Sequence, residues 1–133
     1  MSHVVSFCAW GVPSTQGSAK AFVRGGRAYV THDSGDKLRS WRSVVAAEAH
    51  TAMNGRSPLD APVEITVKFY LPRPKSAPKS RTLPDRKPDL DKLARAIGDA
   101  IEGIVYTQDS RICRWMLSKH YGDPRAHVSV SAL

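Results

Sequence analysis

Apolar and polar residues alternate most regularly over residues 63–71, where every second residue from Val63 to Leu71 is apolar and those between are mostly polar. Side chains of a strand point alternately to its two faces, so this pattern predicts a β-strand with one buried face. Shorter alternating runs predict further strands at residues 4–10, 112–121 and 126–132.

A β-hairpin is predicted around Gly25 and Gly26, which separate short β-rich runs at residues 21–24 and 27–31. Adjacent glycines accept the positive φ angles of a tight turn without steric penalty. The polar segment 14–20, which precedes the hairpin, is predicted to be a loop.

A helix is predicted over residues 36–53, where apolar residues recur every three or four positions. These positions are Leu38, Trp41, Val45, Ala49 and Ala52. Asp33 or Ser34 can cap the start of the helix, and residues 54–55 (Asn-Gly) suit its end.

A second helix is predicted over residues 91–102, with Gly103 at the left-handed position that often follows a helix. Before it, residues 72–88 contain five prolines and six Lys or Arg, with Leu83 as almost the only apolar residue. Such a segment cannot form a packed element, so we expect a mobile basic loop. The loop is either a solvated linker or a contact surface for a polyanion.

The predicted order is strand, hairpin, helix, strand, helix, strand, strand. It indicates an α+β fold with a mixed or mainly antiparallel sheet and two helices packed on one face. At 133 residues the chain, 1–133, is expected to be a single domain with one core.

The charge balance favours a polyanionic partner, because 20 Lys and Arg outnumber 12 Asp and Glu to give a formal net charge of +8. No apolar stretch approaches the roughly 20 residues of a membrane span. The N-terminus does not resemble a signal peptide. We therefore expect a cytoplasmic protein that does not bind membranes or a small-molecule cofactor.

The two cysteines, Cys8 and Cys113, lie in strand-like segments and are expected to be buried thiols of a cytoplasmic protein. The sequence leaves a disulfide between them open. The three tryptophans are expected to lie in the core rather than to stack on bases. They are Trp10, Trp41 and Trp115.

Three acidic residues carry the clearest chemistry: Asp89 and Asp91 directly follow the basic loop, and Asp109 comes about one helix later. Pro88 favours an extended conformation before it, and in extended chain residues two apart project to the same side. We therefore expect Asp89 and Asp91 to lie side by side and to converge with Asp109. Converging carboxylates repel unless a cation lies between them, and Mg²⁺ is the usual cation at phosphate chemistry.

A structural interpretation of the first pair is also open. Asp91 can cap the second helix while Asp89 interacts favourably with the helix dipole, and capping contributes about 1 kcal/mol. That interpretation leaves Asp109 unexplained.

Within the second helix, Asp91, Arg95 and Asp99 are four residues apart and share one face. Arg95 either bridges the two aspartates or points at a scissile phosphate, where it would stabilise the charge of the transition state. Asp99 is expected to orient Arg95 or to cap a neighbouring amide rather than to bind metal.

These residues resemble the core motif of the RusA family of Holliday-junction resolvases, small dimeric Mg²⁺-dependent endonucleases of bacteria and their phages. The family pattern is Asp-x-Asp-Asn-Leu-x-Lys, then Asp-Ala-Leu, then Asp-Asp. The corresponding segments here are 89–95, 99–101 and 108–109. Gly11, Pro13, residues 16–18 and Trp41 are similar to the phage branch, so the resemblance spans nearly the whole chain.

The resemblance implies that Asp89, Asp91 and Asp109 are catalytic residues that bind the metal, and that Arg95 replaces the functional lysine of the family. Lys92 stands in place of the usual Asn, and Gln108 in place of the first downstream Asp. None of these departures removes a predicted metal-binding carboxylate. A planar guanidinium in place of an ammonium changes the geometry of the charge, which affects the rate more than the reaction.

The sequence and the resemblance together predict a Mg²⁺-dependent endonuclease, with Mn²⁺ able to substitute, that resolves four-way DNA junctions as a homodimer in recombination and repair. Six basic residues are expected to contact DNA phosphates. They are Lys75, Lys79, Arg81, Arg86, Lys87 and Lys92. Two alternatives remain: a nuclease for other branched DNA such as flaps and forks, and a basic nucleic-acid-binding module without catalysis.

Overall fold

A four-stranded sheet lies at the centre of the protein in a computed structural model that describes residues 2–15, 19–32 and 35–133. Its strands are β1 (Ser2–Trp10), β4 (Val63–Leu71), β5 (Ile112–Tyr121) and β6 (Arg125–Ala132), in the order β1-β6-β4-β5. β6 is antiparallel to both neighbours, whereas β4 and β5 are parallel. The prediction of an α+β fold with a mainly antiparallel sheet is confirmed.

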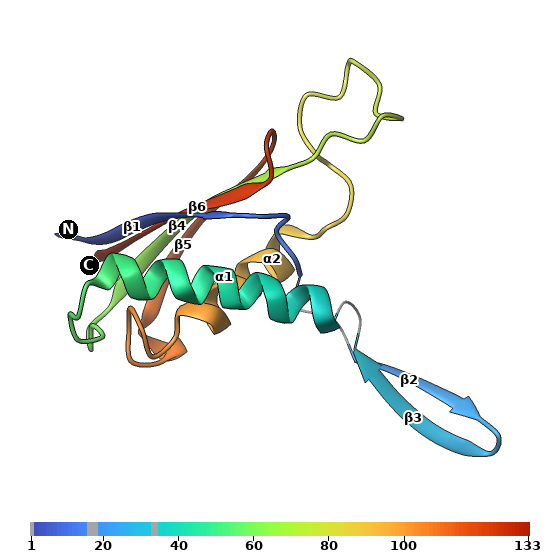
Figure 1. Cartoon of the computed structure of the whole chain (residues 1–133), viewed down its shortest axis with the longest axis horizontal. Helices are drawn as coiled ribbons and strands as arrows, with labels where there is room; N and C mark the ends of the chain where they lie inside the picture. Colours follow the sequence, from blue (N-terminus) through green and yellow to red (C-terminus); the bar gives the residue numbers. More distant parts are fainter. Residues whose placement is uncertain (1, 16–18, 33–34) are drawn as a thin grey trace.

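Both helices, α1 (Gly35–Met53) and α2 (Leu90–Ile101), lie on one face of this sheet (Figure 1). Every second residue of β4, from Val63 to Leu71, is buried on that side, as the alternation predicts. In the part of the chain that the structure describes, no helix covers the other side, which we call the open face. Neither described helix has the length and apolar character needed to cross a membrane.

Helix α1 is anchored by a stripe of buried residues, Trp41, Val45, Ala49 and Met53. Asn54 and Gly55 follow it with positive φ angles of 49° and 79°, so the predicted helix end is confirmed. Its predicted caps, Asp33 and Ser34, lie outside the described residues.

Helix α2 is more strongly amphipathic than α1, and its buried residues pack on α1 and the sheet. Gly103 follows it with a φ of 79°, as predicted. Near its start, the Lys119 ammonium donates hydrogen bonds to the carbonyls of Arg86 (3.0 Å) and Pro88 (2.9 Å). These bonds from β5 fix the point at which the basic loop enters α2.

The predicted hairpin forms a separate two-stranded sheet of β2 (Ala19–Arg24) and β3 (Arg27–His32). Gly25 and Gly26 have φ angles of 58° and 76°, the conformation that only glycine adopts freely. The predicted loop before the hairpin includes residues 16–18, which lie outside the described part, and its last two residues belong to β2.

The basic loop, residues 72–88, contains no helix or strand, as predicted. The Arg73 guanidinium donates hydrogen bonds to the carbonyls of Arg81 (2.8 Å) and Pro78 (2.6 Å), and Pro84 is buried. The loop therefore has internal structure that its composition does not suggest. Its mobility stays a prediction.

The cysteines are both free, but the prediction that both are buried is wrong. Cys8 is half-buried and Cys113 is exposed. Cys113 falls at a register shift between β4 and β5, where Val63 pairs with Ile112 and the next pairing skips a residue. A bulged residue does not follow the alternation of the strand.

The tryptophans are divided between core and surface. Trp41 is buried and Trp115 half-buried against the core, in line with the prediction. Trp10 is 62% exposed, so the prediction is wrong there. The reason is the alternation of β1: Ala9 points into the core, and Trp10 therefore points to the open face.

Candidate active site

The first predicted pair of carboxylates lies at the N-terminal end of α2. Asp89 occupies the N-cap position in an extended conformation (φ −73°, ψ 135°), and the helix begins at Leu90. The expectation of extended backbone up to Asp91 is therefore wrong, because Asp91 already lies in the first helical turn. The two carboxylates remain exposed neighbours in sequence, but the extended-chain argument does not place them side by side.

The capping interpretation of this pair fails as well. Asp91 is inside the helix rather than at its cap, and the Asp89 side chain makes no capping hydrogen bond. Instead, an Asp89 carboxylate oxygen lies 3.7 Å from the Lys92 ammonium, an ion pair that is largely exposed. Favourable interaction of both acids with the helix dipole remains.

Asp109 lies at the opposite end of α2, in a short 3₁₀ turn (Asp109–Arg111) that precedes β5. Its backbone N–H donates to the Glu102 carboxylate (2.8 Å) at the end of the helix. The buried Tyr106 hydroxyl lies 2.8 Å from the carbonyl oxygen of Gly98 and 3.3 Å from an Asp109 carboxylate oxygen. Helix α2 and the turn before β5 thus share one polar site.

Asp99, Glu102 and Asp109 form what we call the acidic cluster. Burial raises the pKa of the Asp109 carboxyl above its ordinary value, and the negative charges of Glu102 and Asp99 raise it further. Burial also raises the pKa of Tyr106, so its hydroxyl stays protonated and can donate a hydrogen bond. The cluster concentrates negative charge that a bound cation would relieve.

The turn that carries Asp109 is held in place by the segment before β4. The Asp60 carboxylate accepts hydrogen bonds from Arg111 Nε (2.8 Å) and Thr107 Oγ1 (2.9 Å), and backbone bonds join Leu59 to Val105 and Thr107. The Arg111 guanidinium lowers the pKa of Asp60. The Asp109 backbone is therefore fixed by bonds on both sides of the turn.

The two ends of α2 are connected by one stripe of its surface. Asp91, Arg95, Gly98 and Glu102 are spaced four, three and four residues apart, which aligns them along a helix. At about 1.5 Å per residue, Asp91 lies about 10 Å along the axis from Gly98, against which Tyr106 packs. Among the described residues, no three His, Cys, Asp or Glu side chains are grouped as a metal site. The structure does not bring the predicted triad together in one preformed group.

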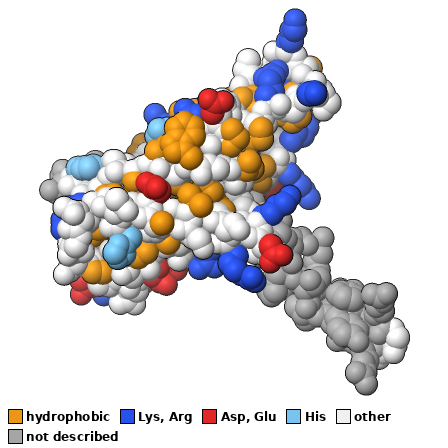
Figure 2. All heavy atoms as spheres, in the orientation of Figure 1, with side chains coloured by type: hydrophobic (Ala, Val, Ile, Leu, Met, Phe, Trp, Pro, Cys, Tyr) orange, Lys and Arg blue, Asp and Glu red, His pale blue; other side chains and the backbone are white. Residues whose placement is uncertain are grey.

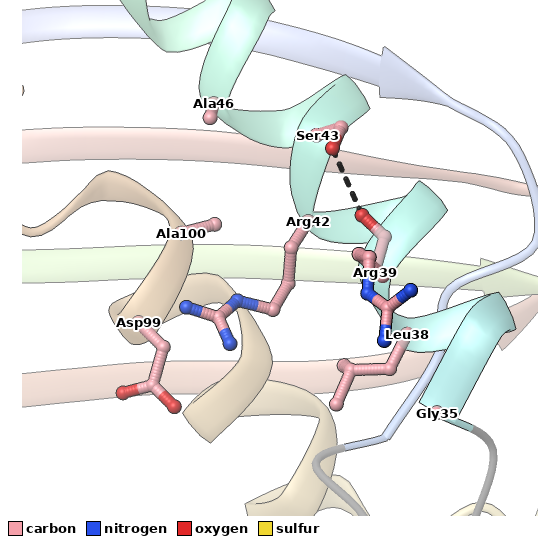
Figure 3. Close-up of a pocket in the computed structure, with 8 residues that line it drawn as sticks. All are labelled: Gly35, Leu38, Arg39, Arg42, Ser43, Ala46, Asp99 and Ala100. Carbon is pink, nitrogen blue, oxygen red and sulfur yellow. Dashed lines mark hydrogen bonds between the residues drawn. The ribbon is translucent and has the colours of Figure 1, made fainter.

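Arg95 does not bridge Asp91 and Asp99 in the structure, and Asp99 does not orient Arg95. Within the described residues, exposed Arg95 makes no ion pair with a carboxylate, so its guanidinium is available to a ligand. Asp99 faces α1 instead, across a cavity of about 450 Å³ that Arg39 and Arg42 also line. Figure 3 shows Arg42 extending from α1 toward Asp99.

Three charged residues at this site were not predicted from the sequence: Glu102, Arg39 and Arg42. Glu102 could have been found from its four-three-four spacing with Asp91, Arg95 and Gly98. The two arginines carry no such signal, because only the packing of α1 on α2 brings them to the cavity.

The predicted DNA-binding residues gather on and beside the basic loop, where Figure 2 shows Lys and Arg on a projecting part of the surface. Lys75, Lys79 and Lys87 are exposed. Arg81 and Arg86 are partly neutralised by Asp85, at 3.4 Å and 2.9 Å. The sixth, Lys92, pairs with Asp89 at the start of α2, which places positive charge beside the N-terminal carboxylates.

Comparison with known proteins agrees with the resemblance. YqaN, an uncharacterised protein of Bacillus subtilis (strain 168), is 27% identical over 137 residues, which cover 95% of this chain and 94% of YqaN. The family model described as endodeoxyribonuclease RusA matches residues 11–131, which include α2, the acidic cluster and the basic loop. Because this match covers nearly the whole chain, the protein belongs to the RusA endodeoxyribonuclease family.

Proposed function

We propose that this protein is a Mg²⁺-dependent endonuclease that resolves four-way DNA junctions by hydrolysing one phosphodiester bond in each of two strands. The observation that carries the proposal is the surface of α2, where carboxylates and Arg95 lie beside the basic loop in a member of an endodeoxyribonuclease family. Carboxylates alone would repel DNA, so their position beside phosphate-binding residues favours a role in chemistry.

The site fits a divalent cation in donor type and in charge. Carboxylate oxygens are the ligands that Mg²⁺ and Mn²⁺ prefer, and the pKa of Asp109 is raised by burial first and then by the negative charges of Glu102 and Asp99. Asp89 and Asp91 at the start of α2, and Asp109 with Glu102 at its end, would offer carboxylate oxygens to a metal as two separate groups, because the described residues hold no single preformed set of three. When bound, the cation would activate water and stabilise charge on the leaving oxygen.

The chain's own residues supply the remaining functions. The protonated Tyr106 hydroxyl keeps the Asp109 carboxylate oriented, and the anchored turn keeps its backbone in place. Arg95, exposed on the same stripe as Asp91, would contact the scissile phosphate and stabilise the transition state. Lys75, Lys79 and Lys87 hold the DNA backbone without reading its sequence.

Resolution of a junction requires two symmetrical cuts, so we propose that the protein acts as a two-fold homodimer. Each copy would contribute one α2 surface and one basic loop. Sedimentation of the purified protein, alone and with a junction, measures this directly: a species of two chains per junction supports the proposal, and a single chain per junction contradicts it.

A panel of DNA substrates tests the proposed substrate class. The purified protein is incubated with labelled four-way junction, fork, flap and linear duplex of matched sequence, each with Mg²⁺ or with EDTA. Preferential Mg²⁺-dependent cutting of the junction supports the proposal. Preferential cutting of flaps or forks would identify the other branched-DNA nuclease, and binding without cutting under any divalent metal would identify a binding module.

A further inference from the structure

The open face of the sheet carries an ordered row of aromatic and cationic side chains. Trp10 of β1 pairs with Arg125 of β6, Arg125 with Tyr70 of β4, and Tyr70 with His120 of β5. Each of the four strands therefore contributes one member of the row. The row crosses the full width of the sheet at the end nearest the basic loop, since Tyr70 is followed by Leu71 and then by that loop.

The members of the row are in contact. The Arg125 guanidinium lies 3.8 Å from the ring centroid of Tyr70 and 5.3 Å from that of Trp10, within the range of cation–π interaction. The Tyr70 and His120 rings are stacked, with centroids 5.2 Å apart. Flat groups thus follow one another from one edge of the sheet to the other.

The guanidinium at the centre of the row is held by hydrogen bonds. Arg125 Nε donates to His127 Nε2 (2.9 Å), and Nη1 donates to the carbonyl of Asp123 (2.8 Å). The His127 ring also meets Tyr70 edge-on, with centroids 5.5 Å apart. Because these contacts fix the planar groups before any ligand arrives, little conformational entropy is lost when one stacks on them.

The rest of the open face combines apolar and polar side chains, among them Met116, which is 54% exposed, and it carries the Lys68 ammonium beside the row. Beside the row lies a hollow of about 670 Å³, whose lining includes Cys8, Thr66, Lys68 and Ser129. Among the open-face residues that the structure describes on β4, the only carboxylate is Glu64, at the far end, where it is neutralised by Arg114 at 2.9 Å. The surface around the row therefore suits a phosphate backbone.

We infer that the open face is a binding site for single-stranded DNA, whose unpaired bases stack on Trp10 and on the Arg125–Tyr70–His120 row while Lys68 contacts phosphate. Exposed aromatic rings and guanidinium planes on a sheet are suited to unstacked bases, and every base offers a π-face. Trp10, 62% exposed, offers the largest free surface. Duplex DNA hides these base faces and should bind this site less well.

A second copy of the chain fits this face less well. In a two-fold contact the same face meets itself, so Arg125 and Lys68 of one copy would approach the cations of the other. The described open-face residues of the row and the hollow beside it include no Asp or Glu to compensate them. Positive charge together with exposed rings favours a polyanion with stackable groups.

This site is separate from the surface of α2, which lies on the other side of the sheet (Figure 1). It does adjoin the basic loop along the chain, because Tyr70 is separated from residue 72, the first of the loop, by Leu71 alone. A single strand leaving a branched substrate held by the loop could therefore continue over the open face. The inference itself does not require cleavage.

The test measures binding of a fluorescein-labelled 15-nucleotide oligothymidine by fluorescence anisotropy, in EDTA at low salt, so that nuclease activity plays no part. The variants are Trp10→Ala and Trp10→Phe, with Leu133→Ala, 46% exposed beside Pro62 at the opposite end of β4, as the control for removing exposed apolar surface. Melting temperatures of all variants verify that they fold. We expect Trp10→Ala to weaken binding by about 5- to 150-fold, the range for loss of one base–aromatic stack. Trp10→Phe and Leu133→Ala should retain most of the affinity.

Two further readouts separate the possible outcomes. Oligothymidine should quench tryptophan fluorescence in the wild type, and this quenching should be largely lost in Trp10→Phe. Unchanged oligothymidine affinity in Trp10→Ala overturns the inference. A Trp10→Ala protein that binds oligothymidine normally but sediments as a smaller species than the wild type would assign the face to contacts between copies instead. Failure of junction cleavage leaves the inference intact, because no step in this test uses it.

Discussion

At the scale of single residues, the acidic cluster brings like charges together, which folding alone would not favour. Asp109 is kept beside Glu102 and Asp99, and its pKa is raised by burial and by their charge. A carboxyl whose pKa is higher in the folded than in the unfolded chain favours folding while it is protonated. That contribution is fully present below the pKa of the unfolded chain and is lost as the pH rises through the raised pKa.

Asp109→Asn should therefore melt at a higher temperature than the wild type at pH 7, and the difference should disappear in acid, where Asp109 is protonated. Thermal unfolding at both pH values measures this, with exposed Asp36→Asn as the control. Mg²⁺ should raise the wild-type melting temperature at pH 7 and have a smaller effect on Asp109→Asn. A lower melting temperature of Asp109→Asn at pH 7 would contradict the account.

Backbone conformation is well predicted at positions where a single residue type is enough to indicate it. Gly25 and Gly26, Asn54 and Gly103 all have the positive φ angles that the sequence indicates. Contacts between side chains were not predictable in this way. The hydrogen bond that Tyr106 donates to Asp109, and the one that the Asp109 N–H donates to Glu102, depend on where the chain returns after α2, and local preference does not determine that.

At the scale of elements, strong periodicity made prediction accurate. The bounds predicted for β4 agree with the structure, and α1 begins one residue before the prediction. For α2 the predicted start was also one residue late, because Leu90 was assigned to the extended segment after Pro88. The position of this boundary decides whether Asp91 is extended or helical. An error of one residue therefore led to the wrong expectation that Asp89 and Asp91 lie side by side on extended chain.

Gly98 offers a test of how α2 packs. A Cβ at this position would lie 3.6 Å from Trp115 and from the Tyr106 hydroxyl oxygen, which is ordinary van der Waals contact. Because glycine costs about 0.5–1 kcal/mol relative to alanine inside a helix, Gly98→Ala should raise the free energy of unfolding by about that amount. Urea denaturation measures the change. A loss of stability would mean that Trp115 and Tyr106 approach α2 more closely than described.

At the scale of the whole molecule, the sequence predicted the class of fold but not its topology. The parallel pairing of β4 with β5 places the start of β5, and therefore Asp109, beside the start of β4 rather than its end. The basic loop and Asp89 follow the end of β4. The predicted convergence of the three aspartates requires Asp89 and Asp109 to lie at the same end of β4. The direction in which β5 pairs with β4 decides this, and it cannot be read from the sequence alone.

Electrostatic binding of DNA is also a property of the whole surface, since five of the six predicted contact residues lie on one loop. Lys79→Ala should make the salt dependence of junction binding less steep by about 0.9 in the slope of log affinity against log salt, if Lys79 neutralises one phosphate. Anisotropy in EDTA at several salt concentrations gives that slope. Lys37→Ala on α1 removes the same charge elsewhere, and an equal effect of both variants would contradict a specific role for the loop.

Carboxylates of α2 support metal-dependent DNA cleavage if a labelled four-way junction, incubated with wild type, Asp91→Asn and Asp36→Asn in Mg²⁺ and in EDTA, is cut only where both the metal and Asp91 are present. We expect paired symmetrical nicks by the wild type and Asp36→Asn in Mg²⁺ only, with cleavage nearly abolished but junction binding retained in Asp91→Asn. Cleavage that persists in EDTA, or in Asp91→Asn at the wild-type rate, would contradict it.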